Sequence, residues 1–138
     1  MQKTAKEYII FPLDFPSMAA AESHIRQLDG RVGMFKIGLE LFIRQGPAVV
    51  KMVKKMSSAG IFLDLKLHDI SATVGRAMAR VSDLGVDLVT VHGASSQKML
   101  GAAVENAGKT NVLAVTLFTD NDADTVRAQG FKDEYVNA

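Results

Sequence analysis

The 138-residue sequence contains no cysteine, which excludes a disulfide framework and any metal site built on thiolates. It also lacks an excess of either charge. Its formal net charge is +1, so bulk electrostatics favour neither nucleic acid nor a membrane surface as a partner. No apolar run approaches the roughly 20 residues that a membrane span requires. The first residues lack the apolar segment of a secretory signal, and we expect a soluble, cytoplasmic protein.

What the sequence does contain is a hydrophobic fraction of 48% and a charged fraction of 22%. This balance predicts a single globular domain over residues 1–138 with a substantial core. Apolar segments predict five strands, each followed by helical segments across short loops. Strands are expected at 8–14, 32–38, 61–67, 86–92 and 111–118, and helical segments at 18–28, 40–43, 46–59, 70–84, 95–106, 120–130 and 131–138.

The alternation of strands and helices specifies a parallel sheet with right-handed crossovers. A doubly wound sheet and a TIM (β/α)8 barrel both fit this pattern. Polar residues at the carboxyl ends of the strands favour the barrel, because barrel active sites lie at that end. The loop after the first strand has no glycine, unlike the phosphate loop of a doubly wound nucleotide-binding fold. We therefore expect an α/β fold of TIM-barrel type, with about the first five βα units of a barrel that takes roughly 250 residues.

Charged side chains gather in the third expected strand. Asp64 and Lys66 share one face, and Leu63, Leu65 and Leu67 share the other, because side chains alternate along a strand. Burying a charge is costly unless an opposite charge lies beside it. The sequence therefore predicts a pair of opposite charges here, either as a structural ion pair of the sheet core or as part of a functional site.

Three further charged groups are expected near the carboxyl ends of the strands, where the Asp64–Lys66 pair lies. Asp14, Lys36 and Asp69 extend the pair to three carboxylates and two ammoniums, an array that is stable only where opposite charges alternate. Such an array suits a reaction in which a negative substrate group lies beside a carboxylate while a lysine donates a proton to a nascent carbanion. His92 is interpreted instead as a strand-end histidine that satisfies a neighbour.

The segments that carry these residues resemble orotidine 5'-phosphate decarboxylases in their order and spacing. The matching segments are Leu13–Phe15, Lys36–Gly38, Phe62–Ile70, Val91–Gly93 and Ala114–Thr119. The Asp-x-Lys-x-x-Asp motif at 64–69 is shared by a wider superfamily. Its combination with Lys36-Ile37-Gly38 and His68-Asp69-Ile70 is specific, and the match extends over essentially the whole chain.

The resemblance implies decarboxylation of orotidine 5'-monophosphate to uridine 5'-monophosphate in pyrimidine biosynthesis, without a metal or organic cofactor. Asp14 would hydrogen-bond a ribose hydroxyl, and Lys36 would contact the ribose and the charged network. Asp64 would lie against the substrate carboxylate. Lys66 would be the general acid that protonates C6 after carbon dioxide leaves. Thr119 would hydrogen-bond the pyrimidine.

The resemblance also implies a homodimer with shared sites, in which Asp69, Ile70 and Thr73 reach into the neighbouring subunit. Two positions depart from the usual pattern: Ser71-Ala72 stands in place of Pro-Asn, and Asp120 in place of Ser. The family's phosphate-binding strands and glutamine-bearing lid have no counterpart in these residues. Because remote phosphate binding supplies energy used at the reacting centre, we expect little or no activity from the 138-residue chain alone.

Two other functions fit the sequence. A hexulose-phosphate synthase or ketogulonate-phosphate decarboxylase shares the Asp-x-Lys-x-x-Asp strand, but those enzymes use magnesium and carry Glu where this chain has Lys36. Lysine does not ligate magnesium, which weakens this interpretation. A non-catalytic half-barrel is the third possibility. Its first and fifth strands would be open edges, and it should dimerise, swap strands or aggregate.

Overall fold

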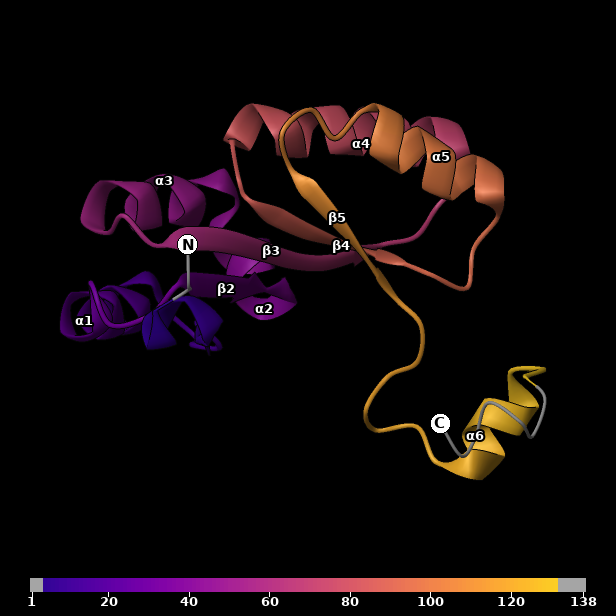
Figure 1. Ribbon diagram of the computed structural model, residues 1–138, viewed down its shortest axis with the longest axis horizontal. Coiled ribbons are helices and arrows are strands. Elements are labelled where there is room, and N and C mark those ends of the chain that lie inside the picture. Colours follow the sequence, from indigo (N-terminus) through magenta and orange to yellow (C-terminus); the bar gives the residue numbers. More distant parts are fainter. Residues whose placement is uncertain (1–3, 132–138) are drawn as a thin grey trace.

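The computed structural model describes residues 4–131 and has a five-stranded parallel sheet layered against helices (Figure 1). The strands are β1 (Ile10–Pro12), β2 (Met34–Gly38), β3 (Gly60–Leu67), β4 (Leu88–His92) and β5 (Asn111–Val115). They lie in the sheet in the order in which they occur in the chain. A doubly wound sheet reverses its strand order, whereas a barrel adds each strand beside the last. The sequential order therefore agrees with the predicted barrel type.

The helices begin and end at residues suited to those positions. They are η1 (Ala5–Tyr8, a 3₁₀ turn), α1 (Met18–Leu28), α2 (Leu39–Gln45), α3 (Pro47–Met56), α4 (Ser71–Leu84), α5 (Gln97–Glu105) and α6 (Ala123–Ala128). At the start of α1, the Ser17 hydroxyl accepts a hydrogen bond from the Ala20 amide. At the start of α5, the Ser96 hydroxyl accepts one from the Met99 amide. Gly85 ends α4 in the left-handed conformation, with φ of 62°.

The hydrophobic core lies between the helices and one face of the sheet. Fully buried side chains of the strands occupy alternate positions, and their helical partners form stripes on α1, α3, α4 and α5. The strand residues that belong to this core are Phe35, Ile37, Ile61, Leu63, Val89 and Val91. The residues between them in the strands, among them Lys36, Asp64 and Thr90, therefore face the other side of the sheet.

Element boundaries differ from the sequence expectation at both ends of the chain. The first strand is shorter than 8–14 because Tyr8 belongs to the η1 turn, although the Leu13 amide still bonds the Lys36 carbonyl at 2.8 Å. The fifth strand ends at Val115 instead of residue 118. Helix α6 is confined to Ala123–Ala128 and lies apart from the helices that cover the sheet (Figure 1). All but the first residue of the helix expected at 131–138 lies outside the described residues.

The two outer strands carry exposed apolar side chains. Ile10 of β1 is 45% exposed and Leu113 of β5 is 46% exposed. Among the described residues, β1 pairs with β2 and β5 pairs with β4, so each outer strand has one paired side. Over residues 4–131, no helix has the length and apolar character needed to cross a membrane.

Candidate active site

Four of the five charged residues predicted from the sequence meet on the sheet face that points away from the helices, and Asp69 does not join them. Lys36 lies in β2 and Asp64 in β3, and the register of the two strands pairs Gly38 with Asp64. Asp14 follows β1, where the Leu13 amide is bonded to Lys36. Three neighbouring strands thus deliver their polar side chains to one place near their carboxyl ends, as barrel geometry requires.

The contacts form a chain of alternating charge. Lys36 Nζ lies 3.1 Å from Asp14 Oδ1 and 3.8 Å from Asp64 Oδ2. Lys66 Nζ lies 2.9 Å from Asp64 Oδ1. Asp64 is the most enclosed member, with 14% of its side chain exposed, whereas Asp14 at the other end is 59% exposed. The predicted alternation of carboxylates and ammoniums is therefore present for these four residues, with Asp64 between the two ammoniums.

Along β3, Asp64 and Lys66 lie together and Leu63, Leu65 and Leu67 pack with the hydrophobic core, as expected, although the strand bulges before it ends. Leu63 pairs with Val89 and Leu67 pairs with Val91, so three residues of β3 stand opposite the single residue Thr90. Lys66 has φ of 50°, the left-handed region that non-glycine residues rarely adopt. The bulge is where the lysine side chain turns back to the carboxylate two residues earlier.

Thr90 is the residue of this site that sequence reasoning missed. Its side chain is buried, with 1% exposure, and its Oγ1 donates to Asp64 Oδ1 at 2.9 Å and accepts the Lys66 amide at 2.8 Å. One sequence signal could have identified it. Thr90 is a hydroxyl residue inside an otherwise apolar run, on the same strand face as the histidine at the strand end.

Electrostatics keep Asp64 ionised. Burial alone would raise the pKa of this carboxyl group. Hydrogen bonds from Lys66 and Thr90, together with the positive charges of Lys66 and Lys36, outweigh burial and lower its pKa below the ordinary aspartate value. The site therefore presents a carboxylate at neutral pH, held by one hydroxyl and two ammoniums.

Gly38 leaves room for the outer part of this network. A Cβ at that position would lie 3.0 Å from Asp14 Oδ1 and 3.4 Å from Lys36 Nζ. The distance of 3.0 Å is tighter than most real Cβ contacts and that of 3.4 Å is at the limit of ordinary van der Waals contact, so a larger residue would displace the Asp14 carboxylate. The Lys-x-Gly spacing of β2 thus places the lysine and provides the space for its partner.

The other predicted site residues lie outside this network. Asp69 and Ile70 are exposed in the turn before α4, where Asp69 Oδ1 accepts the Ile70 amide at 2.6 Å. Thr73 is half-buried in the first turn of α4, and Thr119 is exposed beyond β5. Their predicted roles involve a partner subunit or a bound pyrimidine, and they remain predictions.

His92 lies at the end of β4, as expected, but stacks on a ring instead of satisfying a polar neighbour. Its ring centroid lies 4.8 Å from that of His68, and the two planes are 20° apart. Phe118 contacts it edge-on at 5.3 Å. Its Nδ1 is buried and, among the described residues, has no hydrogen-bond partner.

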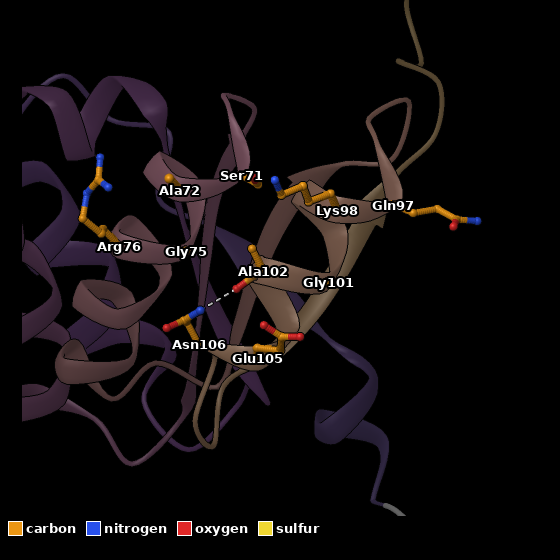
Figure 2. A pocket seen from close by; sticks show the side chains of 10 residues that line it. All are labelled: Ser71, Ala72, Gly75, Arg76, Gln97, Lys98, Gly101, Ala102, Glu105 and Asn106. Atoms are coloured by element: carbon orange, nitrogen blue, oxygen red, sulfur yellow. Dashed lines mark hydrogen bonds between the residues drawn. The ribbon is translucent and has the colours of Figure 1, made fainter.

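A separate groove lies on the outer side of the helical layer. It has a volume of about 600 Å³ between α4 and α5, and Figure 2 shows Gly75 and Ala102 at the point where these helices approach. Arg76 points away from the α5 side chains in this view. This groove shares no residue with the charged network. Over residues 4–131, no group of three or more His, Asp or Glu residues is placed to hold a metal ion.

Comparison with known proteins gives the family of the chain. Residues 7–138 match the family described as Orotidine 5'-phosphate decarboxylase / HUMPS. The orotidine 5'-phosphate decarboxylase of Desulfosudis oleivorans is 43% identical over 136 residues, which cover 97% of this chain and 55% of that protein. The protein of the same name from Anaeromyxobacter sp. strain K is 46% identical over 125 residues, covering 90% of this chain and 55% of that protein.

Solved structures give the same result for the fold. The crystal structure of orotidine 5'-phosphate decarboxylase from Lactobacillus acidophilus matches 93% of this chain and 62% of its own length, with a TM-score of 0.81 and 30% identity. An uncharacterized conserved protein from Geobacillus kaustophilus matches 90% of this chain and 61% of its own length, with a TM-score of 0.82 and 37% identity. The predicted partial TIM-type barrel is therefore confirmed. The chain spans about half the length of the curated relatives it matches.

Proposed function

Because the chain belongs to the orotidine 5'-phosphate decarboxylase / HUMPS family, we propose that its charged network is the decarboxylation site for orotidine 5'-monophosphate. The observation that carries this proposal is the placement of Asp64 between Lys36 and Lys66, at 3.8 and 2.9 Å. The names of the relatives give the reaction class. The product is uridine 5'-monophosphate, and the reaction belongs to pyrimidine biosynthesis in the cytoplasm.

The network suits a reaction that forms a carbanion. The bond between C6 and the carboxylate breaks, the electron pair stays on C6, and carbon dioxide leaves. A fixed ammonium stabilises that developing charge and then supplies the proton. Lys66 has this role in the proposal because its Nζ is held beside an ionised carboxylate and on the open face of the sheet. Asp14 and Lys36 bind the ribose, and Thr119 binds the pyrimidine.

The turn before α4 supports a shared site in a homodimer. Ile70 is 71% exposed although it is a large apolar residue, and it adjoins the exposed Asp69. Their exposure leaves both side chains accessible to a second copy of the chain. We propose that Asp69, Ile70 and Thr73 complete the network of a second copy. Among the described residues of one chain, Asp69 makes no ion pair with Lys36 or Lys66.

The same-family alternative, a magnesium-dependent hexulose-phosphate synthase or ketogulonate-phosphate decarboxylase, has less support. Lys36 Nζ occupies the space between Asp14 and Asp64, and an ammonium at that point repels a divalent cation. Turnover of a hexulose phosphate that depends on added magnesium would favour that alternative over the decarboxylation of orotidine 5'-monophosphate.

A chimera tests the proposal. Residues 7–138 of this chain replace the aligned segment of the Desulfosudis oleivorans protein, so that the site has the remaining length of its relative. We expect the chimera to form uridine 5'-monophosphate, Lys66→Ala to abolish turnover, and the matched surface change Lys51→Ala in α3 to retain it. Activity of Lys66→Ala near that of the chimera would refute the role of Lys66. The 138-residue chain alone should be weakly active or inactive, because energy from remote binding is used at the reacting centre.

A further inference from the structure

Thr90 lies at the centre of β4, opposite the irregular part of β3. The residues on either side of it keep ordinary register, with Val89 paired to Leu63 and Val91 paired to Leu67. The three residues from Asp64 to Lys66 therefore share a single opposite residue. A bulged segment of this kind leaves backbone groups that the regular ladder does not pair.

The Thr90 hydroxyl meets two needs of that segment at once. A hydroxyl has one hydrogen to donate and lone pairs to accept. Here it accepts the Lys66 amide at 2.8 Å and donates to Asp64 Oδ1 at 2.9 Å. One buried side chain thus joins the backbone of the lysine to the carboxylate that the lysine ammonium contacts.

The backbone at Lys66 requires such support. Its φ of 50° places the Cβ of an L residue close to its own carbonyl, a conformation that persists only where surrounding contacts impose it. The bond from the Lys66 amide to Thr90 is such a contact. Without it, residue 66 would relax toward an extended conformation, and the ammonium would move away from Asp64.

We propose that Thr90 is a positioning residue for the Asp64–Lys66 pair. Its hydroxyl holds the left-handed backbone at Lys66 and orients the Asp64 carboxylate, so that Oδ1 faces Lys66 while Oδ2 faces Lys36. The purpose of this arrangement, delivery of a proton to C6, rests on the proposed function. The arrangement itself is testable without any substrate.

The test compares three variants of the 138-residue chain by ¹³C NMR titration of the Asp64 carboxyl group. Thr90→Val keeps the side-chain shape but removes the hydroxyl, and Thr90→Ser keeps the hydroxyl. Thr110→Val is the matched control, because Thr110 is 6% exposed and its hydroxyl bonds the Val86 carbonyl at 2.9 Å, away from the charges. We expect a higher Asp64 pKa in Thr90→Val, and the value of the unsubstituted chain in Thr90→Ser and Thr110→Val.

An unchanged Asp64 pKa in Thr90→Val, or an equal rise in Thr110→Val, would overturn the proposal. If Thr90→Val does not fold, hydrogen exchange of the Lys66 amide in the unsubstituted chain decides. Strong protection supports the bond to Thr90, and exchange at the rate of an unstructured peptide overturns it. Neither measurement reads decarboxylation, so an inactive chimera would refute the proposed function and leave the role of Thr90 in place.

Discussion

Glycine at position 66 should make the protein more stable than alanine does, the reverse of the usual order in a strand. Both substitutions remove the ammonium, and both keep the backbone amide that Thr90 accepts. They differ in the energy needed to hold φ at 50°. A left-handed L residue is disfavoured by roughly 1–2 kcal/mol, a penalty that glycine avoids. Glycine loses more chain entropy on folding, which costs roughly 0.5–1 kcal/mol relative to alanine.

The difference leaves Lys66→Gly more stable than Lys66→Ala by roughly 0–1.5 kcal/mol, with a central value of about 0.75 kcal/mol. For a chain of this length, that free energy corresponds to a difference in Tm of about 2–3 °C. Urea unfolding followed by circular dichroism measures both variants side by side. The matched control is Ala114→Gly in β5, where the backbone does not have positive φ and glycine should destabilise by roughly 0.5–1 kcal/mol. Equal or greater stability of Lys66→Ala would show that the backbone at this residue is not strained.

Four more substitutions test the charged network and the helical layer. Asp64→Asn should lower the free energy of unfolding by about 2 kcal/mol, because it leaves two ammoniums without their shared carboxylate. Asp14→Asn should lower it by less than about 1 kcal/mol, because Asp14 is exposed. Urea unfolding measures both values. Because folding lowers the Asp64 pKa, the ionised carboxylate stabilises the fold at pH values above the unfolded-state pKa near 3.9, and this stabilisation is lost as the pH falls through the folded-state pKa. The free energies of unfolding of Asp64→Asn and the unsubstituted chain should therefore converge in acid and differ at pH 7. Gly38→Ala should leave Tm within about 2 °C of the unsubstituted chain, because the added methyl group displaces only the ends of side chains. In the chimera it should weaken ribose binding several-fold, which would be measured as a higher KM. Gly75→Val should lower stability by roughly 1–3 kcal/mol, because its side chain would press on Asn106 across the α4–α5 contact, and an unchanged urea midpoint would contradict this.

Much of the fold was predictable because its signals are local. Apolar segments separated by short loops indicated the strands and helices, and the serines before α1 and α5 are local signals of the same kind, because each accepts a hydrogen bond from an amide three residues later. The ends of the outer strands were less predictable. Tyr8 has strong strand propensity, yet it belongs to a 3₁₀ turn closed by the Thr4–Glu7 capping box.

The charged site was predictable in its membership but not in its geometry. Asp14, Lys36, Asp64 and Lys66 could be grouped because parallel strands bring their carboxyl ends together. The bulge before Lys66 could not be inferred, since lysine has no preference for a left-handed backbone and the register shift depends on the facing strand. Thr90 was missed for the same reason. Its role exists only when β3 and β4 lie side by side.

The exposed outer strands have a practical consequence for work with this chain. The edge of β1 can accept a parallel strand on one side of the sheet, and the edge of β5 can accept one on the other. Pairing of β5 from one molecule with β1 of the next is a head-to-tail contact. Two molecules joined in this way would have ten strands, whereas a closed TIM barrel has eight. Growth by such pairing would be open-ended, because ten strands do not match the eight of the ring. Yield after refolding should therefore fall steeply as protein concentration rises, and dilute conditions favour recovery of the single molecule.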